Sequence, residues 1–134
     1  MSADGTVTAV AAPSDATRQR AAAELGPEVA LFPDGATLLA GGSVDAVMIA
    51  VSEAAHADAI GSALAAGVPT MYEPPLADTV AATPAMLAAF EKATAPTHAD
   101  IELSFLPAVA RLTELVAAGR LGEPRQAVCR LSSN

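Results

Sequence analysis

The feature that most constrains the fold is the alternation of short apolar runs with alanine-rich stretches along the chain. The clearest run, AVMIAV at residues 46–51, lacks the polar–apolar alternation of a strand with one face in water. Uninterrupted runs of this kind are typical of parallel strands that are covered on both faces. Strands are likewise predicted at residues 7–11, 69–73, 98–103 and 125–131.

Helix signals separate these strands in a regular order. Ser52 can cap a helix that Gly67 ends, and Pro107 opens another that ends at Gly119. The predicted order β-α-α-β-α-β-α-β-α-β favours an α/β domain with a mainly parallel sheet, flanked by helices and joined by right-handed crossovers. The remaining helices are predicted at residues 16–25 and 36–40, and from Thr83-Pro84 through Phe90.

Composition excludes several classes of function. The chain has 134 residues with 7 Lys and Arg against 15 Asp and Glu, a net charge of −8. Such an acidic chain is a poor candidate for binding nucleic acid or an anionic membrane surface. It shows no signal peptide and no apolar run long enough to cross a membrane, so we expect a cytoplasmic protein. The single cysteine, Cys129, excludes an internal disulfide and predicts a small buried apolar residue.

Four stretches in the same order resemble segments of one known family. Residues 44–50, VDAVMIA, followed by His56-Ala57, resemble V-D-A-V-x-I-A-T-P-x-x-x-H-A. Residues 65–76, 105–109 and 115–123 resemble A-G-K-x-V-x-x-E-K-P-L, F-x-P-A-V and L-x-x-x-G-x-L-G-E. Together they make the chain similar to the Gfo/Idh/MocA oxidoreductases. The resemblance implies a Rossmann-like domain, NAD or NADP as cofactor, and sugars or related polyols as substrates of the full-length members.

Departures from that family pattern shape the functional prediction. The glycine-rich G-x-G-x-x-G turn, which cradles the dinucleotide pyrophosphate, is not found in the sequence. Ala12 stands where the family has an acidic residue for the ribose, and Pro74 stands where it has the lysine of E-K-P. The resemblance begins at the family's second strand, so residues 1–134 are expected to form one truncated Rossmann-like domain. Residues 125–134 would be the first strand of the family's second domain.

The resemblance also supplies the candidate site residues. It places Ser52, Glu53, His56, Glu73 and Pro75 near the cofactor, with His56 and Glu73 as the nearby titratable candidates for catalysis. Each has a purely structural alternative: a packed or solvated helix residue for His56, a strand-end carboxylate for Glu73 and a helix cap for Ser52. No metal-ligand spacing is found, and His98 and Glu102 are weaker candidates for any role.

A missing first strand would leave unpaired backbone groups in the middle of the sheet, because that strand is central in the Rossmann order. Three solutions are open: the two halves pair directly, a second chain covers the gap, or the sequence is partial. Three functions remain open in parallel. They are a non-catalytic binding or partner subunit, an oxidoreductase component completed by oligomerisation or a companion chain, and a small-molecule enzyme or binder that uses the Ser52, His56 and Glu73 cleft. A homo-oligomer or a companion protein is the expected partner.

Overall fold

The structure is a computed structural model that describes residues 5–128. The chain divides into two compact units, Met1–Asp100 and Ile101–Asn134. The first unit carries all the strands of the described residues, and the second carries one 3₁₀ turn and one helix.

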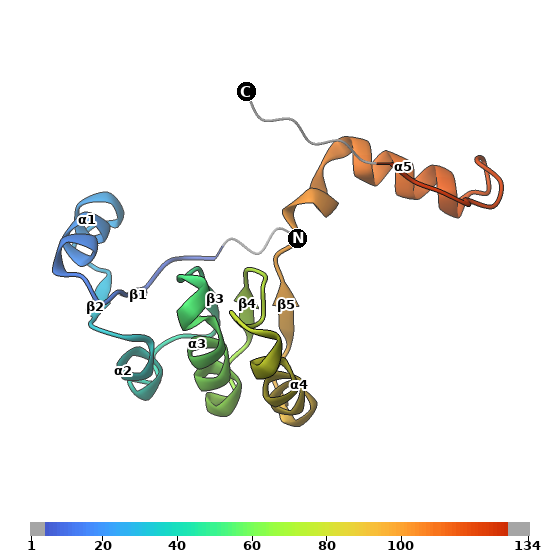
Figure 1. The fold of residues 1–134 in the computed structure, drawn as a ribbon. Coiled ribbons are helices and arrows are strands. Elements are labelled where there is room, and N and C mark those ends of the chain that lie inside the picture. The colour runs from blue at the N-terminus through green and yellow to red at the C-terminus, as the bar shows by residue number, and fades with distance from the viewer. Residues whose placement is uncertain (1–4, 129–134) are drawn as a thin grey trace. The chain divides into compact units, whose positions relative to one another are not determined.

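Two separate parallel sheets make up the first unit (Figure 1). In the smaller sheet Ala9 pairs with Ala30, and in the larger one Val47 pairs with Thr70, which pairs in turn with Thr97. The α/β class and the parallel pairing predicted from the sequence are therefore confirmed. The strands are β1 (Ala9–Ala11), β2 (Ala30–Phe32), β3 (Val47–Ile49), β4 (Thr70–Tyr72) and β5 (Thr97–Ala99).

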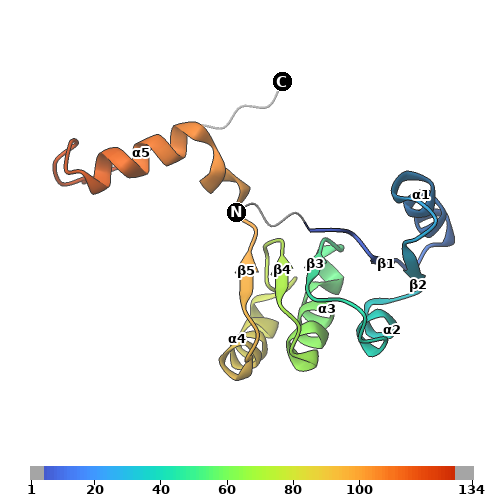
Figure 2. The ribbon, with the colours of Figure 1, turned by 180° about the vertical axis from the view of Figure 1, so that it is seen from behind.

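The helices follow the strands closely in the predicted order (Figures 1 and 2). Their ends show why they stop and start where they do: Gly67 ends α3 in the left-handed conformation at φ 67°, which glycine adopts without steric cost. The helices of the first unit are α1 (Asp15–Leu25), α2 (Gly35–Ala40), α3 (Glu53–Ala66), the 3₁₀ turn η1 (Val80–Ala82) and α4 (Thr83–Lys92).

Three details differ from the sequence-based prediction. Strand β2 was not predicted, because its three residues lie between two prolines and are too few to show the polar–apolar alternation of a strand. The strand expected at 98–103 is shorter, since β5 ends at Ala99 and the 3₁₀ turn η2 (Glu102–Phe105) follows. Within the strand expected at 125–131, residues 125–128 are not a strand, and the rest, with Cys129, lies outside the described residues.

The core of the first unit lies between the three-stranded sheet and one layer of helices. Ile60 of α3 is fully buried, and Ile49 of β3 packs against the same cluster. The helix face of this sheet is thus covered, whereas Met48 of β3 is 62% exposed. The prediction that the 46–51 run is covered on both faces is therefore wrong for the described residues, because helices pack on only one face of β3. The cluster comprises Ile49, Ile60, Ala63, Leu64 and Met86.

The two sheets do not pair with each other. The strand order is β1–β2 in one sheet and β3–β4–β5 in the other, and no ladder joins β1 to β3 among the described residues. Direct closure of the sheet, one of the three solutions for a missing first strand, is therefore not what this structure shows. Helix α2 packs against both β1 and α3, so it connects the two sheets on the helix-covered side.

The second unit contains η2 and the helix α5 (Pro107–Ala117). Proline at the first position of α5 suits a helix start, where its missing N–H has no intrahelical partner to lose. Val109, Leu112 and Val116 form an apolar stripe along α5 and are 37%, 48% and 39% exposed. This helix is amphipathic, as its sequence predicts.

Candidate functional site

The candidate residues lie just beyond the carboxyl ends of β3 and β4, where ligands bind in open α/β sheets. Ser52 and Glu53 begin α3, and Glu73 to Pro75 follow β4. Since β3 and β4 are parallel neighbours, both segments leave the same edge of the sheet. The structure therefore brings these candidate residues to the edge of the sheet at which the strands end.

His56 is the most constrained member of this group. Its side chain is only 2% exposed, although it belongs to the first turns of α3. Nδ1 lies 2.6 Å from the carbonyl oxygen of Pro75, and Nε2 lies 2.9 Å from that of Val51. Both ring nitrogens are therefore occupied by backbone groups of the protein, and the side chains of Ser52 and Glu73 are not among these partners.

The two partners of His56 are both backbone carbonyl oxygens, which only accept hydrogen bonds. The ring lies between the carbonyl that follows β3 and the carbonyl that follows β4. His56 therefore fastens the segment after β3 to the segment after β4, a structural function.

The Glu73-Pro74-Pro75 segment is exposed and differs chemically from a proton-transfer site. The backbone N–H of Glu73 donates to the carbonyl of Ile49 at 3.3 Å and continues the ladder beyond β4. Pro74 offers neither a side-chain donor nor a backbone N–H. Pro75 is joined through a cis peptide bond, and its carbonyl accepts from His56. Of this segment, Glu73 alone carries a group that could act as an acid or base.

Ser52 and Glu53 lie at an exposed helix start. Ser52 has the extended backbone of an N-cap residue, but its hydroxyl makes no capping hydrogen bond. Glu53 lies in the first turn of α3, where a carboxylate favours the positive end of the helix dipole. These two residues therefore remain candidates for contact with a ligand, with no geometry that singles out a particular one.

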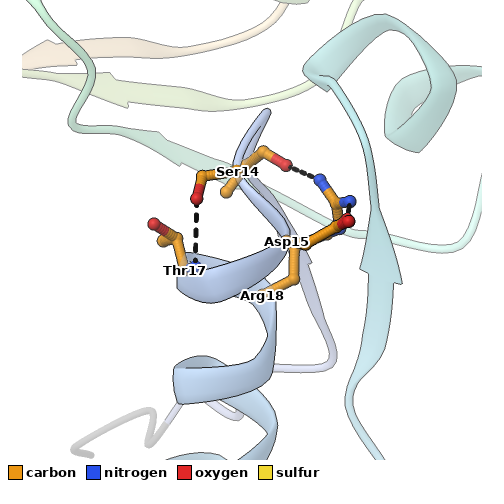
Figure 3. A network of polar contacts seen from close by, with 5 residues as sticks. Ser14, Asp15, Thr17 and Arg18 are labelled. Atoms are coloured by element: carbon orange, nitrogen blue, oxygen red, sulfur yellow. Dashed lines mark hydrogen bonds and ion pairs between the residues drawn. The ribbon is translucent and has the colours of Figure 1, made fainter.

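An arginine that sequence reasoning did not single out lies at the carboxyl end of β1 (Figure 3). Arg18 donates to the carbonyl oxygen of Ala12 and forms an ion pair with Asp15. Ser14 caps the same helix, accepting from the Thr17 amide at 3.5 Å. The spacing of three residues from Asp15 could have revealed Arg18, because i,i+3 neighbours meet on a helix.

Two shifted pKa values lie outside the candidate residues. Burial raises the pKa of Tyr72, whose ring packs against Phe90 at 5.6 Å between centroids. Hydrogen bonds from the backbone and side chain of Thr37 lower the pKa of Asp34, the N-cap of α2. The Thr37 amide donates to Asp34 at 2.7 Å. Both groups have structural surroundings that explain their shifts.

Other types of site are not found in the same part of the chain. Across residues 5–128 no group of three or more His, Cys, Asp or Glu side chains could hold a metal ion. Within that same range no helix is both long and apolar enough to cross a membrane. A shallow hollow between α3 and α4, lined among others by Gly61, Leu64 and Lys92, lies along the C-terminal half of α3 and contains none of the candidate residues.

The strands are parallel and are joined by helical crossovers, and the candidate residues follow the carboxyl ends of the strands. These features define a Rossmann-type α/β domain. Residues 1–100 match the oxidoreductase family with an NAD-binding Rossmann fold, GFO_IDH_MocA. The chain belongs to this family, which confirms the resemblance found in the sequence. The family is one of NAD-binding proteins.

Individual relatives agree with this assignment. The chain is 30% identical over 121 residues to D-apiose dehydrogenase of Paraburkholderia graminis, a match that covers 90% of this chain and 32% of the relative. It is 31% identical to an NAD-binding oxidoreductase structure from Klebsiella pneumoniae, with a TM-score of 0.76 and coverage of 87% and 31%. A scyllo-inositol dehydrogenase structure from Lactobacillus casei with bound NAD(H) and scyllo-inositol gives 24% identity, a TM-score of 0.79 and coverage of 87% and 34%. The chain thus spans about a third of the length of these relatives.

The described residues fit a dinucleotide poorly. A pyrophosphate needs backbone amides that converge from a glycine turn at a helix start, and residues 5–128 contain no strand–helix turn with three spaced glycines. Ala12, 9% exposed, offers no carboxylate to ribose hydroxyls. His56 is already bonded on both nitrogens. What remains for a ligand is the exposed Ser52, Glu53 and Glu73.

Proposed function

We propose that this chain acts as a non-catalytic binding or partner subunit of the oxidoreductase family. The observation that carries this proposal is the state of His56, which is buried and engaged by the Val51 and Pro75 carbonyls. With Pro74 in the position of the family's lysine, the exposed acid–base groups among the candidate residues are the carboxylates of Glu53 and Glu73. Two carboxylates without a lysine, beside an engaged His56, support ligand contact better than hydride-transfer chemistry.

Calorimetric titration of the chain with NAD(H) and NADP(H) tests this proposal. We expect no saturable heat through millimolar coenzyme, because no cradle among the described residues holds the pyrophosphate. Circular dichroism before and after each titration verifies that the chain is folded. Binding in the micromolar range by the chain alone contradicts the proposal. As a matched comparison, Pro74→Lys returns the family's lysine, and we expect it to produce no dehydrogenase activity.

A second candidate is a component of an NAD(P)-dependent sugar or polyol oxidoreductase that a companion chain or a second copy completes. The separate sheets favour it, because a further polypeptide could fill the space between them. Arg18 beside Ala12 adds a preference within this candidate: a small residue with an arginine nearby suits the 2′-phosphate of NADP. It predicts coenzyme turnover only when the companion is added, with NADP(H) preferred and the preference lost in Arg18→Ala.

The third candidate, a small-molecule enzyme or binder in the Ser52, His56 and Glu73 cleft, has less support. Its central side chain, His56, has no ring nitrogen left for a substrate. Homo-oligomerisation and a cytoplasmic location stay predictions of the first proposal. Sedimentation across micromolar concentrations tests the former, and a monomer throughout contradicts it.

A further inference from the structure

We draw no further inference here: the strongest candidate, the apolar stripe that Val109, Leu112 and Val116 form along α5 of the second unit, carries no proposal because nothing in the structure shows what covers it.

Discussion

The two sheets of the first unit differ sharply in how much apolar surface they bury against helices. The three-stranded sheet packs against α3 and α4, with Ile60 fully buried and Ile49 only 8% exposed. In the two-stranded sheet Leu31 is 40% exposed, and α1, described in full, has no buried residue. The three-stranded half therefore has a core of its own, whereas a two-stranded sheet without such a core is marginally stable.

This contrast shows what a central strand contributes to a doubly wound sheet. The helices on one face of the three-stranded sheet bury apolar area even without a central strand. Strands β3, β4 and β5 therefore stay packed against these helices. The backbone groups on the facing edges of β1 and β3 need a central strand as hydrogen-bond partner. The face of the sheet without helices needs the crossover helix of that strand. The layered half therefore supports the fold on its own, whereas the facing edges of β1 and β3 have no strand partner among the described residues.

The largest expected effect is in the core of the three-stranded half. Ile60→Ala removes a fully buried side chain and should lower the free energy of unfolding by about 2–5 kcal/mol. Leu31→Ala, in the two-stranded half, should change it by only about 0.5 kcal/mol, because Leu31 is largely exposed. Urea unfolding followed by circular dichroism measures both. Equal losses would show that the two halves share one core.

Substitution of His56 should have the next largest effect on stability, and this effect distinguishes a structural role of the side chain from a catalytic one. His56→Ala removes the buried ring that contacts the Val51 and Pro75 carbonyls and should cost about 1–3 kcal/mol in unfolding free energy. His98→Ala, at an exposed position of β5, should cost about 0.5 kcal/mol or less. Thermal unfolding of the three proteins makes the comparison. A His56→Ala chain as stable as the His98→Ala chain would exclude the fastening role.

A pair of glycine substitutions in and after α3 should have opposite signs. Gly67 adopts φ 67°, so Gly67→Ala should destabilise the chain by about 1 kcal/mol through backbone strain. Gly61 lies inside the helix, and a methyl group added there would meet no other atom within 4 Å. Gly61→Ala should therefore stabilise the chain by about 0.5–1 kcal/mol. Melting temperatures that move in the same direction for both variants would contradict the helix boundary at Gly67.

The smallest effect is a pH dependence in α2, which joins the two halves. Hydrogen bonds from Thr37 lower the pKa of Asp34 in the folded chain. The Asp34 carboxylate therefore stabilises the fold at pH values above the pKa that this carboxyl has in the unfolded chain. This contribution is lost as the pH falls through the lower folded pKa. Asp34→Asn keeps an amide oxygen for the cap and cannot ionise. Its melting temperature should change less than that of the unmodified chain between neutral and strongly acidic pH.

Sequence patterns predicted much of this fold because they reflect interactions between residues that are close in sequence. The apolar run around Val47, the cap at Ser14 and the stop at Gly67 each depend on neighbours in sequence. Strand β2 escaped prediction because it has three residues, and its pairing with β1 depends on a contact about twenty residues away along the chain. The exposure of Met48 could not be predicted either, because a run of apolar residues does not say whether a second helix layer exists.

The location of the candidate residues in the fold was predicted in part for a similar reason. The edge on which Ser52, Glu53, Glu73 and Pro75 lie follows from the order of parallel strands. The engagement of His56 does not, because its partner Pro75 is nineteen residues further along the chain. Arg18 was missed because its contact with Ala12 depends on the turn that joins β1 to α1. Contacts across turns and between strand ends depend on the folded arrangement of the chain, which local patterns do not encode.

Residue-resolved amide hydrogen exchange of the unliganded chain tests the open edges most directly. The account predicts slow exchange for Val47 and Ala12, whose amides donate to neighbouring strands at 2.9 and 3.1 Å. It predicts fast exchange for Met48 and Ala11, whose amides lie on the edges of β3 and β1 that have no ladder partner among the described residues. Equal protection of Met48 and Val47 would mean that β3 is paired on both sides, and the account of two separate sheets would then be wrong.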